Sequence, residues 1–429
     1  MTQPTDREPD PRTLRVNVDR LWDDLHRLSE IGRGDRGISR LAFSPQDMEA
    51  RQWLLRRFEA AGIPARMDSY GNVFGRLGGV QEGDLGERSP GAAPVLMIGS
   101  HVDTVPEGGM FDGALGVLAG LECLRTLKES GVRLPFAVDV AAFSNEEGAR
   151  LGPGTFGSRV LLEGISDDEW MKVSPVLKEA GLGHGVEGGP SLDPAHLRAY
   201  LELHVEQGGV LDASGEDIGV VQGIVCIKLF YVTFKGVPNH AGTTPMGHRK
   251  DALLGAAELV LSVPKVVREV GSPITVGTSG QIRVSPGGRN IIPGEAEISI
   301  EVRDLDDEVA SRVVESLRNK ASEIASSRGL RVEMSRVAST AGAGMAPEIQ
   351  DIIEREAAAL GLSTRRMPSG AGHDAMTFGN KVPSGMIFVP SRGGISHSPE
   401  EWTSKEHCGN GAQVLLRTVL ALAAGRTGR

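Results

Sequence analysis

The chain has 429 residues, of which 40% are hydrophobic and 24% are charged, and its formal net charge is −10. This composition is typical of a globular protein, and the length is sufficient for two domains with separate cores. The negative charge argues against nucleic acid and against an anionic membrane surface as partners. Because no apolar run reaches about 18 residues, we expect no transmembrane span and no membrane partner.

Cysteine usage and the N-terminus bear on the cellular compartment. Cys123, Cys226 and Cys408 are widely spaced and form no CxxC pair. The polar residues 1–10 contain no recognisable signal peptide. Both features predict a reduced, cytoplasmic protein.

Helices and strands alternate in the first part of the chain. Apolar side chains at helical spacing predict a helix over 21–28, and Ser44-Pro45 predicts the start of a second helix. Apolar runs predict strands at 72–77 and 95–98, and the small-residue segment 113–127 predicts a closely packed helix.

The loop between that last strand and helix carries His101, Asp103 and Asp112. Open α/β sheets place their chemistry just past the carboxyl ends of strands. Imidazole and carboxylate groups together suit Zn²⁺, Mn²⁺ or Co²⁺. We expect the Asp103 carboxylate to accept the second ring N–H of His101 and so to orient it. A polar loop with two capping acids is the alternative interpretation of this segment.

Two further predicted strands end in polar residues of the same kind. The strand at 136–143 is followed by Glu146 and Glu147, and the strand at 199–203 is followed by His204. Successive side chains of an extended segment diverge, so one glutamate can bind a metal while its neighbour faces a bound water. An acidic turn is the simpler alternative. Residues 163–198 are predicted to be a helical insertion.

The pattern changes after about residue 215. Strands are predicted at 227–235, 274–284, 295–303 and 331–337, and helices at 251–270 and 308–327. The order β-α-β-β-α-β is that of the ferredoxin-like unit. We therefore expect an α/β catalytic domain with a mixed sheet between helices, formed by residues 1–214 and 338–429. An α+β domain, residues 215–337, is inserted into it.

The last part is predicted to contain a helix at 347–360, two glycine-rich loops with His373 and His397, and a closing helix at 413–424. Candidate metal ligands now lie in separate loops, nearly all after predicted strands: His101, Asp112, Glu147, His204 and His397. Five such ligands can hold two metals ~3.5–4 Å apart with one shared carboxylate. Glu146 is then placed as a general base.

The joint pattern resembles the M20 metallohydrolases, in particular their hydantoinase/carbamoylase branch. That branch includes N-carbamoyl-L-amino acid hydrolases, β-ureidopropionase and allantoate amidohydrolase. The resemblance covers the chain from about residue 20 and is carried by G-S-H-V-D-T-V (99–105), F-D-G (111–113), F-S-N-E-E-G (143–148), L-H-V-E-Q-G (203–208), N-H-A-G-T-T-P-M-G (239–247), S-G-A-G-H-D-A (369–375) and I-S-H-S-P-E-E (395–401). It implies a zinc-exopeptidase-like catalytic domain and an inserted lid that forms a homodimer.

The resemblance also assigns the metal ligands. His101 and His204 would bind one divalent ion, Glu147 and His397 the other, and Asp112 would bridge them, with a cis peptide bond following Asp112. Zn²⁺ is the first expectation, and Mn²⁺, Co²⁺ and Ni²⁺ are alternatives because all tolerate this ligand set.

Substrate and further catalytic residues follow from the same resemblance. His240 would reach the partner's active site to polarise the carbonyl, and Asn290 and Arg303 would hold the substrate. Asp103 is a further catalytic candidate because of its expected contact with the His101 ring. The planar guanidinium of an arginine suits a bidentate carboxylate. Further candidate substrate contacts are Gln207 for the ureido group, His373, and Lys228, which stands where relatives often have arginine. Plainer alternatives are a capping role for His240, a salt-bridged strand end for Arg303 and a structural role for His373.

The expected reaction is hydrolysis of the carbamoyl C–N bond of an N-carbamoyl-L-amino acid or a related ureido acid to amine, carbon dioxide and ammonia. Allantoate and β-ureidopropionate are alternative substrates. The alternative within enzymes is an M20 aminoacylase or peptidase. Two features argue against it: peptidases of the family carry an acid where this chain has His204, and the His101–Asp112 interval is short. A catalytically inactive binding protein on the same scaffold is the rival from another class.

Overall fold

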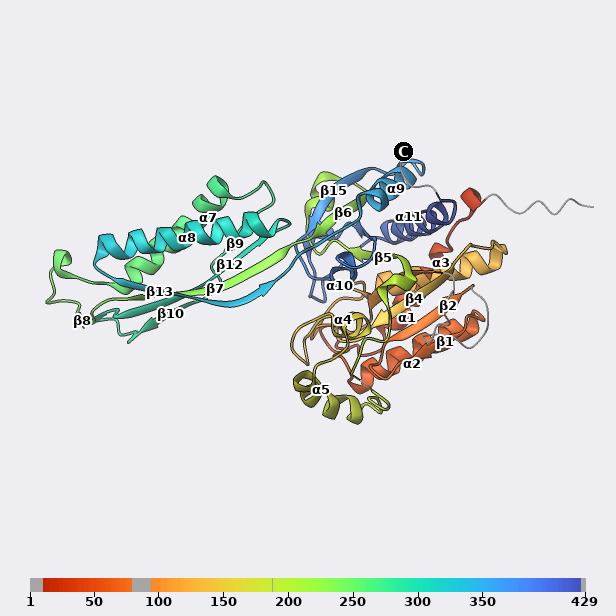
Figure 1. Ribbon diagram of the computed structural model, residues 1–429, viewed down its shortest axis with the longest axis horizontal. Coiled ribbons are helices and arrows are strands. Elements are labelled where there is room, and N and C mark those ends of the chain that lie inside the picture. Colours follow the sequence, from red (N-terminus) through yellow and green to blue (C-terminus); the bar gives the residue numbers. More distant parts are fainter. Residues whose placement is uncertain (1–10, 79–93, 187, 426–429) are drawn as a thin grey trace, which may run out of the picture. The chain divides into compact units, whose positions relative to one another are not determined.

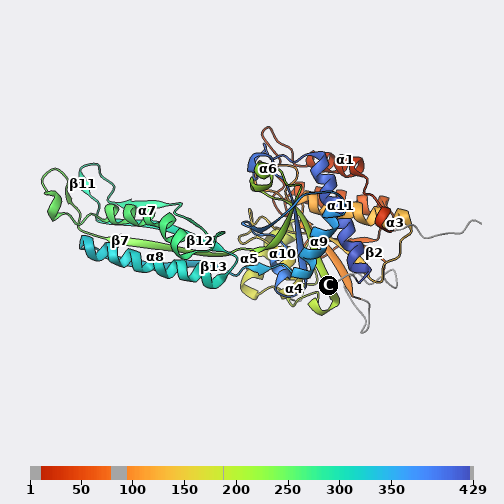
Figure 2. The ribbon, with the colours of Figure 1, turned by 90° about the horizontal axis from the view of Figure 1, so that it is seen from above.

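The computed structural model describes residues 11–78, 94–186 and 188–425. The chain divides into two compact units (Figures 1 and 2): Met1–Gln222 with Gly344–Arg429, and Gly223–Ala343. The sequence pattern predicts the inserted segment at 215–337. The differences arise because residues 218–222 belong to a strand of the larger sheet, whereas the last strand of the smaller unit runs on to Thr340.

The larger unit is built on a nine-stranded mixed sheet with the order β1-β2-β4-β3-β5-β16-β6-β14, and β15 pairs with β6. The strands are β1 (Ala65–Met67), β2 (Val73–Leu77), β3 (Val95–His101), β4 (Ala137–Phe143), β5 (Leu197–Val205), β6 (Ile218–Ile224), β14 (Ala343–Gly344), β15 (Thr364–Ser369) and β16 (Ser384–Val389). Strand β3 is parallel to β4 and to β5, and β5 is parallel to β16. Their carboxyl ends therefore meet at one edge, and the expected mixed sheet is confirmed.

Helices cover this sheet: α1 (Val18–Ser29), α2 (Pro45–Ala60), α3 (Ala114–Ser130), α4 (Phe156–Glu163), α5 (Asp167–Glu179), α6 (Val210–Ser214), α9 (Pro347–Ala358), α10 (Ala375–Gly379) and α11 (Lys405–Ala423). The predicted start of α2 is confirmed, since the Ser44 side chain accepts a hydrogen bond from the Asp47 N–H and Pro45 is the first helical residue. Helix α11 begins eight residues before its predicted start, at a Ser404 cap.

The side chains of strand β5 point to both faces of the sheet, and only one of these faces belongs to the main hydrophobic core. Successive side chains of a strand point to opposite faces. Leu201, Leu203 and Val205 join the main hydrophobic core together with α3 and α11. Tyr200 points to the other face and stacks on Phe378 of α10, with ring centroids 4.0 Å apart. His204 shares the face of Tyr200, so its imidazole lies on the side of the sheet away from the main core.

The smaller unit has a five-stranded antiparallel sheet, with the order β10-β12-β7-β13 and with β9 paired to β12. Helices α7 and α8 lie side by side along one face of it (Figures 1 and 2). Its elements are β7 (Cys226–Lys235), α7 (Ala252–Val270), β9 (Val276–Thr278), β10 (Ile282–Ser285), β12 (Glu295–Asp304), α8 (Asp307–Arg328), β13 (Arg331–Thr340) and the short ribbon of β8 (Asn239–His240) with β11 (Ile291–Ile292). Both β7 and β10 pair with β12 between them, as in a split β-α-β unit. The single strand predicted at 274–284 is in fact two short strands.

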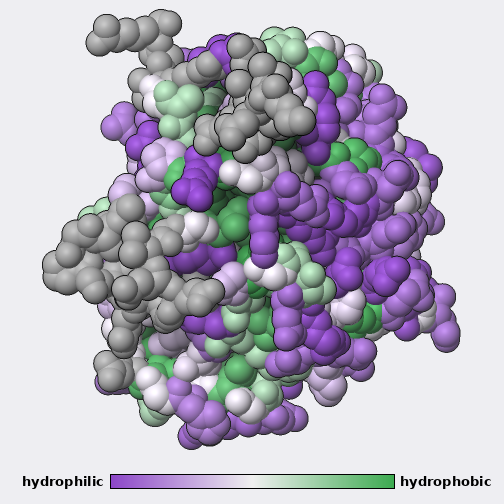
Figure 3. Space-filling view, turned by 90° about the vertical axis from the view of Figure 1, so that its right-hand side faces the viewer, coloured by the Kyte–Doolittle hydropathy of each residue, from purple (hydrophilic) through white to green (hydrophobic). Residues whose placement is uncertain are grey.

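Strands β6 and β16 were not predicted. Strand β16 is buried along its whole length, and a short apolar run of this kind cannot be distinguished from a buried helical segment by periodicity. All three cysteines are buried and free. In the described residues no helix is long and apolar enough to cross a membrane. On the face of the larger unit shown in Figure 3, hydrophilic residues predominate and hydrophobic ones form small patches.

Candidate metal centre

His101 ends β3 and His204 lies near the end of β5, so the parallel strands bring both imidazoles to the same edge of the sheet. The Nδ1 of His101 lies 3.0 Å from the backbone oxygen of Asp103, and that of His204 lies 2.9 Å from the oxygen of Val205. A carbonyl oxygen only accepts, so each Nδ1 carries the proton. Each Nε2 therefore has a lone pair that could bind a metal, and that of His204 accepts the Gly113 N–H at 3.1 Å.

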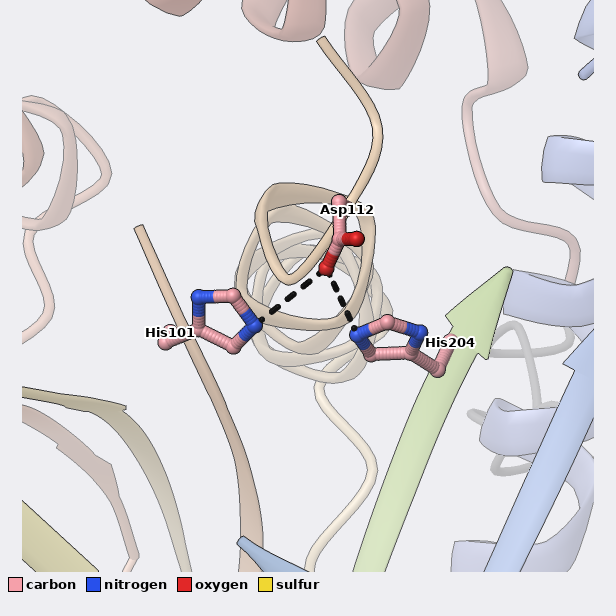
Figure 4. A group of neighbouring side chains, drawn as sticks. All are labelled: His101, Asp112 and His204. Atoms are coloured by element: carbon pink, nitrogen blue, oxygen red, sulfur yellow. Dashed lines mark ion pairs between the residues drawn. The ribbon is translucent and has the colours of Figure 1, made fainter. Parts of the chain in front are cut away.

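Asp112 lies just before α3 and points between the two imidazoles (Figure 4). Its Oδ1 is 3.4 Å from the Nε2 of His101 and 3.3 Å from the Nε2 of His204. These ligand atoms all lie within 4.8 Å of one another. They form the first of two candidate clusters.

The second cluster uses the other oxygen of the same carboxylate. Asp112 Oδ2 is 3.5 Å from the Nε2 of His397, which is in turn 3.3 Å from Oε2 of Glu147. Glu147 follows β4, and His397 comes from the loop between β16 and α11 with a positive φ of 53°. The two oxygens of Asp112 are thus divided between two groups of ligands.

The chemistry of these donors fits divalent cations. The Nε2 atoms of both imidazoles point toward Asp112 Oδ1, an arrangement of donor atoms that a bound cation would stabilise. Asp112 Oδ1 and Glu147 Oε1 are buried and have no hydrogen-bond partner among the described residues. Burial alone would lower the pKa of His101, but Glu146 and Asp112 raise it well above its usual range. The hydrogen bond to Glu147 raises the pKa of His397 to about 9. Both shifts are caused by carboxylates close to the imidazoles, and the same negative charge would stabilise a divalent cation.

Glu146 lies beside the first cluster, with Oε2 3.6 Å from the Nε2 of His101. Burial, followed by nearby carboxylates, raises its pKa well above the ordinary value, although His101 opposes this. A buried carboxyl group with a raised pKa is suited to accept and return a proton near neutral pH.

Asp103 does not contact His101 as expected. Its carboxylate is 3.9 Å from the imidazole Nδ1, which binds the Asp103 backbone oxygen instead. The carboxylate accepts the N–H groups of Glu146 at 3.4 Å and Glu147 at 3.3 Å. Arg51 attracts the same carboxylate from α2, at 3.8 Å. The expected imidazole contact is therefore wrong, and Asp103 instead holds the backbone of the two glutamates.

Arg51 is a residue that the sequence analysis missed. It is fully buried and bonds Asp47 at 3.0 Å and the backbone oxygens of Gly71, Ala142 and Phe143 at 2.8, 3.3 and 3.4 Å. Its spacing of four residues from Asp47 on a predicted helix was a usable signal for this pair.

Gln207 and His373 both lie in the larger unit. The Gln207 amide nitrogen is 2.7 Å from Asp112 Oδ2 and 3.4 Å from His397 Nε2, so Gln207 borders the second cluster. His373 is buried, packs edge-on against His204 with ring centroids 4.5 Å apart, and lies 2.9 Å from Ser369 Oγ. Burial, together with His204, lowers its pKa well below the usual value, so the ring is neutral.

A third group of side chains that could hold a metal is formed by Glu202, His204 and His373. The position of Glu202 is explained by its hydrogen bonds within the protein. The oxygens of Glu202 already accept hydrogen bonds from the Ser100 hydroxyl, the Tyr200 hydroxyl and the Ala375 N–H. Glu202 therefore ties β3 and α10 to β5 beneath His204.

The remaining predicted residues lie in the smaller unit. His240 and Asn290 are neighbours on the β8–β11 ribbon, where Ala241 N–H donates to the Asn290 oxygen. Arg303 lies at the other end of β12, beside β9. From Glu295 to Arg303 the strand spans about 27 Å at ~3.4 Å per residue, and the labels β8 and β9 mark the two ends in Figure 1. Within one chain Asn290 and Arg303 do not form a single site.

The side-chain contacts of these residues differ. Gly242 N–H and Thr243 N–H donate to the Nδ1 of His240 at 3.0 and 3.3 Å, so its Nε2 carries the proton. Lys228 pairs with Asp307 at 2.6 Å. Arg303 pairs with Glu301 at 2.7 Å.

The backbone after Asp112 differs from expectation. The cis peptide bond in the described residues is Ser285–Pro286, so the cis bond expected between Asp112 and Gly113 is absent. The chain turns at Gly113 with a positive φ of 64°, and a Cβ there would collide with the His101 ring. Only glycine combines this conformation with the close approach of the imidazole.

The comparisons with known proteins agree with this architecture. Residues 97–421 match the model of Peptidase family M20/M25/M40. The chain belongs to this family. It is a hydrolase acting on carbon–nitrogen bonds other than peptide bonds.

Relatives define the branch of the family. The chain is 37% identical to an N-carbamoyl-L-amino acid amidohydrolase of Geobacillus stearothermophilus, over 96% of this chain and 100% of that protein. It is 32% identical to an allantoate amidohydrolase of Bacillus subtilis strain 168, over 94% and 97%. A crystal structure of an amidase of the hydantoinase/carbamoylase family from Burkholderia multivorans matches with a TM-score of 0.85 at 34% identity, over 96% and 99%. The resemblance to the hydantoinase/carbamoylase branch is confirmed.

Proposed function

We propose that this chain is a dinuclear metal amidohydrolase that cleaves the carbamoyl C–N bond of an N-carbamoyl-L-amino acid. The main support is the division of Asp112, whose Oδ1 faces His101 and His204 while its Oδ2 faces His397. A carboxylate placed in this way can bridge two ions. Zn²⁺ is the first candidate, and Mn²⁺, Co²⁺ and Ni²⁺ suit the same donors.

Bound divalent ions would lower the pKa of a water molecule and polarise the carbamoyl oxygen. Glu146 would accept the proton of the water that attacks the carbamoyl carbon. It would then return this proton to the leaving nitrogen as the first C–N bond breaks. The remaining carbamic acid would lose carbon dioxide and release the second nitrogen, so that the products are amine, ammonia and carbon dioxide. The raised pKa of Glu146 suits both transfers. Asp103 would support this step by holding the Glu146 backbone.

The smaller unit would complete the site by closing over the substrate. His240 would donate its Nε2–H to the oxygen that becomes negative in the transition state. Asn290 and Arg303 would hold the substrate, with Arg303 binding its carboxylate. Because they lie at opposite ends of β12, they can act on one small molecule only if they come from different subunits. Gln207 would bind the ureido group, and Lys228 and His373 are secondary candidates for substrate contact.

The surface of the smaller unit supports a homodimer as the active form. Eight exposed large hydrophobic residues of the described chain lie in this unit, against three in the larger unit. They include Leu254 and Leu261 on α7, with exposed fractions of 42% and 79%, and Ile282 on the edge strand β10, at 53%. Leu254 and Leu261 are seven residues apart and so lie on the same face of α7, as in a helix that packs against a partner. A second copy of the chain would cover this face and bring His240 to the other active site.

Mixing two inactive variants tests this arrangement. His240→Ala and Glu146→Gln should each be inactive alone, yet subunit exchange between them should restore about one quarter of wild-type activity. Half of the dimers are then mixed, and each mixed dimer holds one site with an intact Glu146 and an intact His240. Activity that stays at the level of the separate variants, when native mass spectrometry shows mixed dimers, would contradict action in trans.

The substrate class is tested by ammonia release. We expect N-carbamoyl-L-amino acids to be hydrolysed with kcat/KM at least about tenfold above allantoate, β-ureidopropionate and ureidoglycolate. The assay should be run on metal-free enzyme and after addition of Zn²⁺ or Mn²⁺, with dipeptides and N-acetyl-amino acids in parallel. Preference for another ureido acid would revise the substrate only. Hydrolysis of dipeptides alone would favour a peptidase, and protein that binds no metal would favour a binding protein.

A further inference from the structure

Glu401 has no part in the chemistry described above, yet it is buried beside the second ligand cluster. Its Oε1 accepts the N–H of Phe111 at 3.0 Å and the N–H of Asp112 at 3.1 Å. Its Oε2 lies 2.9 Å from the hydroxyl of Ser396. The same hydroxyl is 3.1 Å from Asp112 Oδ2, the oxygen that faces His397. Glu401 therefore binds the backbone of the bridging residue directly. The Ser396 hydroxyl lies between the Glu401 and Asp112 carboxylates, and its single proton can be donated to either of them.

The contacts join two loops that are far apart in the sequence. One loop carries Asp112, and the other carries Ser396, His397 and Glu401. Packing reinforces the hydrogen bonds, since a Cβ on Gly109 would collide with the Glu401 side chain. The ring of Phe111 also packs edge-on against Trp402, with centroids 5.6 Å apart. The loop around Asp112 is thus fitted closely to the Glu401 carboxylate.

Other roles for Glu401 are less compatible with these contacts. Oε1 already accepts two N–H groups, and Oε2 faces the Ser396 hydroxyl inside the protein, so the contacts of Glu401 are with the chain itself. The candidate ligand clusters in the described residues do not include Glu401. The exposed fraction of Glu401 is 4%, which excludes a solvated surface acid.

We propose that Glu401 and Ser396 form a clamp that positions the bridging carboxylate of Asp112 for the second metal ion. Asp112 Oδ2 lies near two donors, the Ser396 hydroxyl at 3.1 Å and the Gln207 amide nitrogen at 2.7 Å. Because a carboxylate oxygen has two lone pairs, Ser396 can keep one of them while a cation takes the other from Gln207. Glu401 fixes the backbone at 111–112, and Ser396 fixes the rotation of the carboxylate. Both are positioning residues, and the assignment rests on the dinuclear centre proposed above. Outer partners of this kind typically change metal affinity by about 10- to 100-fold.

The test measures metal binding instead of activity. Stepwise Zn²⁺ titration against a competing chelator, with metal content determined by mass spectrometry, gives the two affinities. Co²⁺ absorption spectra of His204→Ala and His397→Ala assign each affinity to a cluster. In Glu401→Ala we expect the second site to weaken about 10- to 100-fold and the first to change less than about threefold. Ser396→Ala, which keeps the two backbone bonds of Glu401, should weaken the second site by about tenfold.

Two variants serve as controls. Glu401→Gln should rescue the site to within about threefold of wild type, because the amide oxygen can accept both N–H groups and the amide nitrogen can donate to Ser396. Glu400→Ala removes the exposed neighbouring acid and should change neither affinity. Circular dichroism and thermal melting show whether each variant folds. If Glu401→Ala does not fold, the metal affinity of Ser396→Ala tests the clamp.

Failure of the clamp is distinguishable from failure of the dinuclear centre. If wild-type protein binds two ions and Ser396→Ala binds both with unchanged affinity, the clamp is refuted while the centre stands. The clamp would also be refuted if Glu401→Gln and Glu401→Ala lowered the metal affinity of the second site equally. The negative charge of Glu401, and not its hydrogen bonds, would then be what the site needs. Wild-type protein that binds fewer than two ions would overturn both proposals.

Discussion

Replacing Glu146 by glutamine is expected to lower kcat for hydrolysis of an N-carbamoyl-L-amino acid by about 10³-fold, because the variant loses the group that accepts the proton of the attacking water. Glutamine keeps the shape of the side chain and leaves the Asp103 contact to the backbone intact. Metal content should therefore stay at two ions, and KM should change by less than about threefold. Steady-state ammonia release and metal analysis of the same preparation check both expectations.

The matched control is Glu163→Gln. Glu163 is the last residue of α4, pairs with Lys381 and belongs to none of the candidate ligand clusters, so its replacement should leave kcat unchanged. A Glu146→Gln variant with kcat within about tenfold of wild type would contradict the role of general base. Loss of metal along with activity would instead indicate that Glu146 supports the metal centre.

The second large effect is expected at Asp112. Asp112→Ala should bind neither ion with measurable affinity and should have no detectable activity, because both clusters lose their shared ligand. Asp112→Asn is more informative, since its single amide oxygen can serve only one cluster and its NH₂ group faces the other. We expect Asp112→Asn to retain one ion and to bind the second more than about 100-fold more weakly. This loss is larger than the one expected from changing a residue that only contacts a ligand.

Metal titration compares Asp112→Asn with a control variant, Asp35→Asn, which changes an exposed acid in the loop at 32–37. Asp35→Asn should bind two ions normally. If Asp112→Asn bound two ions with wild-type affinity, the carboxylate would not bridge, and the two-ion proposal would fail. Thermal melting with and without Zn²⁺ provides a second readout, since a ligand that binds only the folded state raises its stability.

Local residue patterns were sufficient for most individual elements. Helix α2 begins where Ser44 and Pro45 predict, and β3 and β4 follow their apolar runs. These features depend on neighbours within a few residues, so no knowledge of distant parts of the chain is needed. Short buried strands such as β16 were missed because their stability comes from the strands beside them, here β5 and β6.

Residue types at strand ends also indicated the candidate ligands. His101, Asp112, Glu147, His204 and His397 were proposed from their loops, and parallel strands bring the first four toward one sheet edge. The carboxylate partner of His101 was wrongly expected to be Asp103. A choice between a backbone oxygen and a carboxylate depends on what else attracts that carboxylate, and Arg51 comes from another element.

The sequence by itself determined the order of elements, the faces of the strands and the identity of the metal-ligating residue types, because these follow from periodicity and local chemistry. Only the tertiary structure decided which oxygen of Asp112 faces which cluster, and that Glu401 binds the backbone of residue 112 across 289 positions. It also decided that Asn290 and Arg303 lie at opposite ends of one strand. Contacts between distant segments depend on how complete elements pack, and no local pattern encodes that packing.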